Sequence, residues 1–286
     1  MTDPIKLIGN VASPYTRKMV AYLRYKRIPY EVIWGQPEDV LREMNIEPPK
    51  PILLPVFILD RDGHATAVTD STPLIREFEE KYPDRSVLPK DPALNFINFI
   101  LEDFGDEWCT KFMFHYRWHF DEDADNAGTI LPLGINSTLL DDELAFFKEH
   151  FAKRQIDRLW VVGSNNDTAE FIDNSYKKVL TIYEEHFKKQ PFLLGNFPSS
   201  CDFAVYGQFT QLVGFDPSPR RIAHEISPRT VAWVSTLEDR GGLSYSEENK
   251  SLDSLSDSIH DLFKELATSY IPTCLLYTSD AADEGL

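Results

Sequence analysis

The chain has 286 residues, of which 42% are hydrophobic and 13% aromatic, so it holds enough apolar material for one large domain or two small ones and is not a disordered chain. Its 29 basic and 46 acidic residues give a net charge of −17, which argues against a nucleic acid or an anionic membrane surface as partner. No apolar run reaches the length of a membrane span, and the first residues lack the pattern of a signal peptide. The cysteines have neither metal-site nor redox-motif spacing, which suits a reducing cytoplasm and predicts no bound metal.

The N-terminal part alternates short apolar strands with helices. A β-branched, alternating run such as 30–34 is typical of a strand, and Asp62-Gly63 is typical of the turn between two hairpin strands. The order strand, helix, strand, short helix, strand, strand, helix predicts a four-stranded sheet with helices packed on its faces. The expected strands are 5–8, 30–34, 56–60 and 64–68, and the expected helices are 14–27, 36–45 and 74–81.

The loop after the first strand ends at Ser13 and Pro14, directly before a helix. Serine is a favoured N-cap, and proline is tolerated in the first helical turn. The serine hydroxyl is therefore expected at the positive end of the helix dipole, beside backbone N–H groups that have no helical partner. Such a site suits an anion, and a thiolate is one.

Residues 82–92 are rich in proline and polar side chains, which marks a linker, and everything after them is expected to be helical. From Leu94 to His119, apolar and aromatic residues recur every three or four positions, over about seven turns of one long helix. Acidic residues at 102, 103, 106 and 107 form like-charge pairs, which we interpret as a solvated face rather than a metal site. Ser199 and Asp202 predict a capping box. Further helices are expected at 141–159, 169–189, 203–213, 228–237 and 252–270, with a loop at 121–134.

These elements divide the chain into an α/β domain at 1–83, a linker at 84–92 and an all-helical domain at 93–273. Residues 274–286 resemble the translated read-through of a transposon-type sequencing adapter. We therefore expect them to be an artefact that is not part of the fold, with an ordinary tail as the alternative.

A small α/β domain, a proline-rich linker and an all-helical domain resemble the cytosolic glutathione transferase superfamily, whose N-terminal domain is thioredoxin-like. Four local patterns carry this resemblance, in order and at family-like spacing. They are Ser13-Pro14-Tyr15 after the first strand, Leu54-Pro55-Val56 where the family has a cis-proline, Asp70-Ser71 at a helix start, and Gly195 through Asp202. The first pattern is similar to the serine-type transferases, and residues 105–108 and 115–118 are similar to a poorly characterised bacterial subgroup.

The resemblance implies a glutathione site in the N-terminal domain. Ser13 would donate a hydrogen bond to the thiolate of glutathione and lower its pKa. The backbone of Leu54, turned outward by a cis bond to Pro55, would pair with the extended tripeptide like an added strand. Asp70 and Ser71 would hold the γ-glutamyl end. The implied activity is a detoxifying addition of glutathione, the co-substrate, to a small hydrophobic electrophile, by a protein expected to be cytoplasmic and able to form a homodimer.

Residues of the long helix are candidates for the substrate pocket, because the resemblance places that helix across the cleft from Ser13. Trp108, His115 and Arg117 could contact the electrophile there, and Tyr15 is a second hydroxyl donor in the same loop as Ser13. The alternative for His115 is a satisfied core histidine, and the alternative for Ser13 is a helix cap alone.

Two departures from the family pattern bear on the activity. The segment 51–53 is apolar where the family often has a basic residue for the glycyl carboxylate, and Lys50 is the nearest substitute. This favours an alternative, a non-catalytic binding protein that kept the fold. Ser13 stands where reductase-like members have a cysteine, so disulfide exchange, which needs a thiolate, is disfavoured. Glutathione-dependent isomerisation or ether cleavage would use the same site and stays open.

Overall fold

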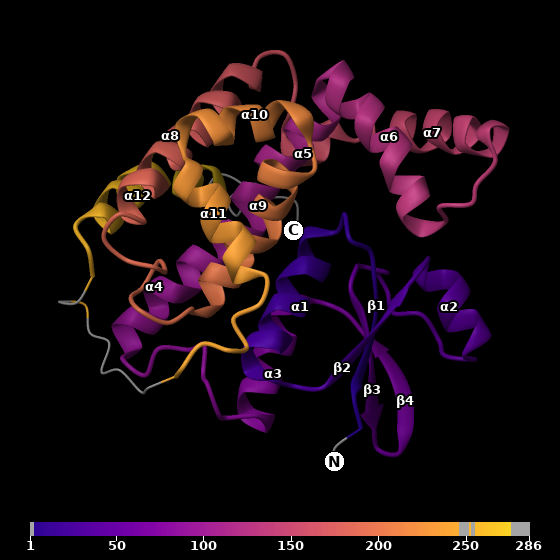
Figure 1. The fold of residues 1–286 in the computed structure, drawn as a ribbon, viewed down its shortest axis with the longest axis horizontal. Helices are drawn as coiled ribbons and strands as arrows, with labels where there is room; N and C mark the ends of the chain where they lie inside the picture. The colour runs from indigo at the N-terminus through magenta and orange to yellow at the C-terminus, as the bar shows by residue number, and fades with distance from the viewer. Residues whose placement is uncertain (1–2, 246–251, 253–254, 276–286) are drawn as a thin grey trace, which may run out of the picture.

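The computed structural model describes residues 3–245, 252 and 255–275, and the expected α/β domain followed by a helical domain is confirmed within them (Figure 1). Residues 276–286, most of the segment that resembles an adapter sequence, lie outside the described part. Among the helices that the structure describes, none has the length and apolarity needed to cross a bilayer.

The N-terminal domain contains one mixed sheet with the strand order β2-β1-β3-β4. Strands β1 and β2 pair in parallel, whereas β3 pairs antiparallel with both β1 and β4. The turn between β3 and β4 is Asp62-Gly63, and both residues have positive φ, 55° and 79°, as the predicted hairpin turn requires. The strands are β1 (Ile5–Gly9), β2 (Tyr30–Trp34), β3 (Val56–Arg61) and β4 (His64–Val68).

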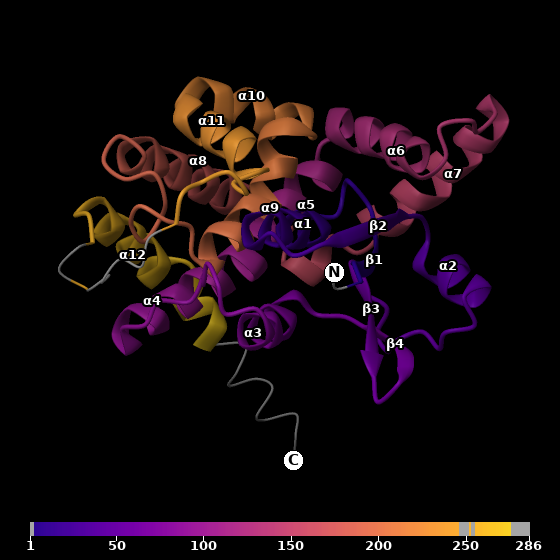
Figure 2. The ribbon, with the colours of Figure 1, turned by 60° about the horizontal axis from the view of Figure 1, so that its bottom comes forward.

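Helices cover both faces of this sheet because side chains alternate along each strand. On one face, Leu7 and Phe57 join the main core with α1 (Pro14–Lys26) and α3 (Ser71–Lys81). On the other face, Ile8 and Val56 form a small separate cluster with Leu41 of α2 (Pro37–Glu43). Figure 2 shows α1 and α3 between the sheet and the helical domain, with α2 on the far side.

The C-terminal domain is organised around α9 (Ser200–Gly214), which is buried along almost its whole length and packs against α1, α4, α5, α10 and α11. Gly207 permits the close approach of α9 to the N-terminal domain, since a Cβ there would lie 2.4 Å from the carbonyl oxygen of Pro14. The remaining helices are α4 (Pro92–Asp103), α5 (Cys109–His119), α6 (Asp121–Ile135), α7 (Asp141–Ile156), α8 (Ala169–His186), α10 (Pro217–Ile226), α11 (Pro228–Leu237) and α12 (Ser258–Thr268).

The start of α9 has the predicted capping box. Asp202 accepts hydrogen bonds from the backbone N–H groups of Ser199 and Leu193, both at 2.8 Å, and its side chain is fully buried. One carboxylate thus fixes the helix start and the preceding turn together.

The long predicted helix is interrupted in its middle. A π-helical segment, Phe104–Trp108, separates α4 from α5. A Cβ on Gly105 would lie 2.8 Å from the backbone nitrogen of Val205 in α9, so the segment approaches α9 as closely as glycine allows. Such π-helical turns inside α-helices often mark functional sites.

Two parts of the helical domain differ from the sequence expectation. The predicted loop at 121–134 is wrong, because it forms α6, whose first turn carries Asp121, Glu122 and Asp123, the charges that favour a helix N-terminus. Helix α10 was not expected, although Pro217 at its first turn is a start signal. Helices α6 and α7 pair with each other and project from the body of the domain (Figures 1 and 2).

Candidate functional site

A cavity of about 720 Å³ lies between the N-terminal domain and the α4 end of the helical domain. Among its lining residues are Ser13, Leu54, Asp70 and Ser71, which come from three separate segments of the N-terminal domain. The structure therefore brings these four predicted side chains to one place. We call this cavity the acidic cleft, for the side chains on its opposite wall described below.

Ser13 caps α1 and borders the cavity at the same time. Its Oγ accepts a hydrogen bond from the backbone N–H of Thr16 at 3.2 Å, and its side chain is half-buried. Because a hydroxyl can accept and donate together, the capping bond leaves the proton of Ser13 available for a ligand. The cap interpretation and the ligand interpretation are thus compatible.

Leu54 lies at the entrance to β3, where the peptide bond to Pro55 is cis, as the resemblance implied. A second cis bond, between Lys50 and Pro51, was not expected. Among the described residues, the backbone N–H of Leu54 has no hydrogen-bond partner. Pro55 is buried beneath the cavity wall, so Leu54 is the residue of this pair that a ligand could reach.

Asp70 and Ser71 form the start of α3 at the cavity wall. Asp70 has a φ of 79°, which is unusual for a residue with a side chain and is a form of backbone strain that accumulates at functional sites. Its carboxylate accepts from the backbone N–H of Thr72 at 3.2 Å and is otherwise exposed. Ser71 is buried, and its Oγ accepts a hydrogen bond from the ammonium of Lys18 at 3.0 Å, which leaves its own proton to donate.

Lys18 is a site component that the sequence interpretation missed. Its side chain is fully buried in α1, and its Nζ lies 2.6 Å from Asp106, 3.2 Å from Glu102 and 3.0 Å from Ser71. Burial alone would lower the pKa of Lys18, but the carboxylates of Asp106 and Glu102 outweigh it and raise the pKa above its ordinary value. The signal was a lysine on the apolar stripe of α1, one residue before buried Met19.

Glu102 contradicts the interpretation of the acidic run as a solvated face. Its carboxylate is buried, and it also accepts hydrogen bonds at 2.6 Å from Arg76 and from Ser200. Burial works to raise its pKa, but Lys18 and Arg76 prevail and hold the pKa below its usual range. Helix periodicity alone could not reveal this, because Lys18 and Arg76 are distant in sequence.

The remaining acidic residues of this run form the opposite wall of the cavity. Asp103, at the end of α4, and Asp106 and Glu107, in the π-helical segment, line it. Burial and neighbouring carboxylates raise the pKa of Glu107, and burial and Glu102 raise the pKa of Asp103. With Asp70, four acidic residues line the cleft, and none of the described lining residues is basic.

Tyr15 borders the cleft, but its hydroxyl is directed into the protein. It donates to the carbonyl oxygen of Asp106 at 2.8 Å and lies 3.1 Å from the hydroxyl of Thr110. Burial and Asp106 raise the pKa of Tyr15 well above its usual range. The phenol is therefore committed to an interdomain contact, and its expected use as a second donor in the cleft finds no support in this geometry.

Trp108, His115 and Arg117 are buried in the helical domain, and none of them is among the described residues that line the cleft. The expectation that they face the cleft is therefore corrected. The physical reason is that α9 packs beside α5, so these three side chains face core helices. The residues of the predicted long helix that do line the cleft are Phe99 and the acidic residues of the opposite wall.

Each of the three has a structural partner. The indole N–H of Trp108 donates to Ser175 at 3.3 Å, and Nδ1 of His115 lies 2.8 Å from the hydroxyl of Ser164. Burial and the neighbouring His119 lower the pKa of His115 to about 4, so it is a neutral core histidine. Arg117 pairs with buried Asp216 at 2.9 Å and donates to the carbonyl oxygen of Ala12 at 3.3 Å, which ties the Ser13 loop to the helical domain.

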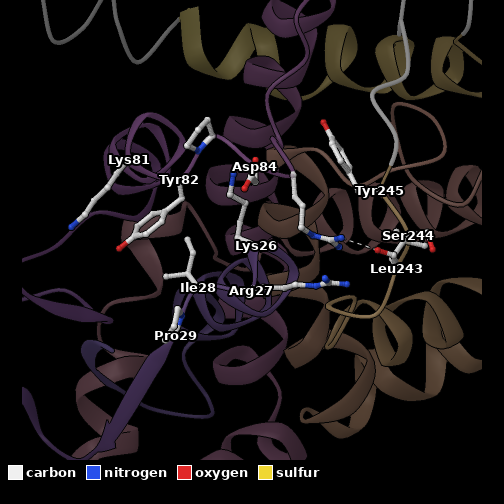
Figure 3. A pocket seen from close by; sticks show the side chains of 12 residues that line it. Lys26, Arg27, Ile28, Pro29, Lys81, Tyr82, Asp84, Leu243, Ser244 and Tyr245 are labelled. Carbon is white, nitrogen blue, oxygen red and sulfur yellow. Dashed lines mark hydrogen bonds between the residues drawn. The ribbon is translucent and has the colours of Figure 1, made fainter. Parts of the chain in front are cut away.

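No group of three potential metal-ligating side chains is placed to hold an ion within the part of the chain that the structure describes. Figure 3 shows a second cavity, of about 1030 Å³. It shares no lining residue with the acidic cleft.

Comparison with protein families matches residues 7–86 to the N-terminal domain of glutathione S-transferase and residues 166–240 to its C-terminal domain. Similar solved structures include a Ceriporiopsis subvermispora glutathione S-transferase in complex with glutathione, at 19% identity, 83% coverage of this chain, 99% of that one and a TM-score of 0.51. A Pseudomonas fluorescens family member with two glutathione bound has 13% identity, 83% and 91% coverage, and a TM-score of 0.51. A glutathione S-transferase-like protein of Pseudomonas syringae has 13% identity, 82% and 67% coverage, and a TM-score of 0.52. No curated protein sequence matches the chain, and identities at this level establish a shared fold.

Proposed function

Because the chain belongs to the glutathione S-transferase superfamily, we propose that its acidic cleft binds glutathione as a co-substrate and adds the thiolate to a small hydrophobic electrophile. The observation that carries the proposal is the convergence of Ser13, Leu54, Asp70 and Ser71, from three segments, on one cavity. These are the positions at which the resemblance implies contacts to the thiol, the peptide backbone and the γ-glutamyl group.

In this proposal the γ-glutamyl end meets the start of α3. The exposed carboxylate of Asp70 pairs with the ligand's ammonium, and the hydroxyl of Ser71 donates to its carboxylate. Lys18, behind the cavity wall, supports this contact. Its ammonium donates a hydrogen bond to Ser71 Oγ and so directs the hydroxyl proton of Ser71 toward the ligand. The backbone N–H of Leu54, which has no partner among the described residues, pairs with the tripeptide backbone.

The thiol then lies near Ser13. A cysteine thiol has an unperturbed pKa of about 8.5, so only a few per cent is ionised at neutral pH. A hydrogen bond from the Ser13 hydroxyl, together with the positive end of α1, stabilises the thiolate and lowers that pKa. Ser13 acts as a hydrogen-bond donor and forms no covalent bond with substrate.

The electrophile occupies the apolar part of the cleft. Leu53 and Phe99 are both 51% exposed and line it, as does Ile52. Apolar side chains that reach solvent beside a reactive group suit a small hydrophobic molecule. Conjugation, isomerisation and ether cleavage all start from the same thiolate, and we favour conjugation because it requires no further acid or base in the cleft.

The test is calorimetric titration of glutathione into wild type and Ser13→Ala, with thiolate absorbance followed on the same samples. We expect binding to wild type with a thiolate signal that disappears in Ser13→Ala. A matched control is Ser235→Ala, an exposed helical serine outside the cleft, which should leave both signals unchanged. Absence of binding at millimolar glutathione would overturn the proposal.

One observation favours a second candidate function, a non-catalytic binding protein with the same fold. Four acidic residues and no basic one among the described lining residues are unfavourable for a ligand with two carboxylates. Lys50, the substitute considered for the glycyl carboxylate, is exposed and is not among the described lining residues. Titration of glutathione with thiolate absorbance separates the two functions, because only the first requires glutathione to bind with its thiol ionised.

The proposal extends to assembly and location. We propose a homodimer that acts in the cytoplasm, with a glutathione-binding domain at 1–83, a linker at 84–92 and a helical domain at 93–273. Sedimentation velocity on the full chain tests the assembly. A monomer at micromolar concentration would contradict it, whatever the outcome of the glutathione titration.

A further inference from the structure

The second cavity is lined by both domains. Its walls are the end of α1 with the following turn, the segment after α3, and residues 243–245 of the helical domain (Figure 3). Its volume of about 1030 Å³ is large enough for a small organic molecule. We call it the basic pocket, for the charges described next.

The charge of this pocket is opposite to that of the whole chain. Four of its described lining residues are cationic, Lys26, Arg27, Lys81 and Arg85, and one, Asp84, is anionic. The chain as a whole has 29 basic and 46 acidic residues. Four cations against one anion leave an excess of three positive charges, and Glu79, paired with Lys26 behind the wall, reduces this to two.

Arg85 is the most constrained of these cations. Only 9% of it is exposed, and its guanidinium donates to the carbonyl oxygens of Tyr25 at 2.6 Å, Leu243 at 2.8 Å and Arg240 at 3.2 Å. All three acceptors are neutral, and no carboxylate of the described residues pairs with it. A guanidinium has five N–H donors, so two remain for a ligand. Burial, assisted by nearby Arg27, lowers the pKa of Arg85, as expected of a cation that has no anionic partner.

Lys26 adds a second buried cation. Its side chain is fully buried, and its Nζ lies 2.7 Å from Glu79. The carboxylate of Glu79 also accepts hydrogen bonds from Tyr22, Ser86 and the backbone N–H of Val87, so its charge is shared between Lys26 and three hydrogen-bond donors. Burial lowers the pKa of Lys26 despite this pair. An anion in the pocket would offset the cost of both buried cations.

We propose that the basic pocket binds a phosphorylated small molecule. A phosphate monoester carries a charge of about −1.5 to −2 at neutral pH, which matches the excess of two positive charges. The planar fork of an arginine and the point charges of lysines are the side chains that recognise phosphate. Tyr82 and Tyr245 lie on opposite sides of the pocket in Figure 3 and add aromatic surface to its walls for the organic part of the ligand.

The test is calorimetric titration of inorganic pyrophosphate into the full chain at low ionic strength. We expect saturable binding that weakens as salt is added. Lys81→Gln and Arg27→Gln remove exposed cations, so the variants should fold, and each is expected to weaken binding about fivefold to tenfold, with the double variant losing it. The control is Lys188→Gln, an exposed lysine paired with Glu185 outside the pocket, which should bind as wild type does.

The outcomes separate this proposal from its alternatives and from the proposed transferase function. Equal binding by the wild type and the double variant, or no binding at millimolar pyrophosphate, would overturn it. Citrate is the second probe, because equal affinity for citrate would show a general anion site and overturn the phosphate assignment. Ser13→Ala should bind pyrophosphate as wild type does, so failure of the glutathione site leaves this test intact.

Discussion

The acidic cleft and the basic pocket are both lined by the two domains, yet their charges are opposite. The cleft has four acidic residues and no basic one among its described lining residues, whereas the pocket has four basic residues and one acidic residue. Behind the wall of the cleft lies a cation, Lys18, which pairs with Asp106. Behind the wall of the pocket lies an anion, Glu79, which pairs with Lys26. A net charge of −17 predicts neither arrangement, because the charge of a cavity depends on which charged groups the packing of the chain places in its wall.

We expect the largest loss of stability from a substitution of Lys18, the buried cation behind the wall of the acidic cleft. Lys18→Met leaves Glu102 and Asp106 without their ammonium partner, and a buried charge without a partner typically costs about 3 to 5 kcal/mol of unfolding free energy. Urea denaturation of wild type and variant measures this loss.

The matched control for that experiment is Lys188→Met. Lys188 pairs with Glu185 on the surface, and we expect a change within about 0.5 kcal/mol. A loss below about 1 kcal/mol for Lys18→Met would show that the buried carboxylates do not depend on the ammonium of Lys18.

Binding to the two cavities can be compared only at pH values at which the protein stays folded, and His115 contributes to the loss of stability in acid. Its pKa in the folded protein is about 4, against an ordinary value of 6.5, so between these values the unfolded chain takes up a proton that the folded chain does not. Stability therefore falls as the pH decreases from 6.5 to 4, by about 2 to 3 kcal/mol from this residue.

The dependence of unfolding free energy on pH tests this assignment. His115→Gln should flatten the decrease between pH 6.5 and pH 4, whatever its effect at neutral pH. His150→Gln, a change at an exposed histidine, serves as the control and should keep the wild-type slope. An unchanged slope in His115→Gln would remove His115 as its cause.

A substitution of Asp202 is expected to lower the stability of the fold without changing ligand binding in either cavity. Asp202→Ala removes a buried carboxylate that holds two backbone N–H groups, so we expect a loss of about 1 to 3 kcal/mol. Because Asp202 lines neither cavity, the variant should bind glutathione and pyrophosphate as wild type does below its unfolding temperature. Loss of glutathione affinity with an unchanged melting temperature would contradict this.

The smallest effect on stability is expected at Ser13, and it distinguishes the two cavities most directly. Ser13→Ala removes an N-cap bond, which costs about 1 kcal/mol. The variant should lose the thiolate signal of glutathione and keep pyrophosphate binding. Parallel titrations measure both, and loss of both ligands together would mean that the substitution acts through the fold.

The sequence predicted the elements whose signals are local. The strand and helix order of the N-terminal domain, the Ser13 cap, the Asp70-Ser71 helix start and the Asp202 capping box all depend on residues within a few positions of one another. The same local signals were present for α6 and α10, in an acidic first turn and in Pro217, but α6 also contains glycine and proline, which are typical of a loop.

Tertiary structure decided what lines each cavity. The acidic run at 102–107 is partly buried and partly a cleft wall. Lys18 and Arg76, distant in sequence, neutralise buried Glu102, whereas Asp103 and Glu107 are exposed and line the cleft. Trp108, His115 and Arg117 lie in the core because α9 packs beside them. Periodicity predicts that a helix has a buried face, but which neighbour covers that face, and which charges it brings, is determined only when distant segments pack together.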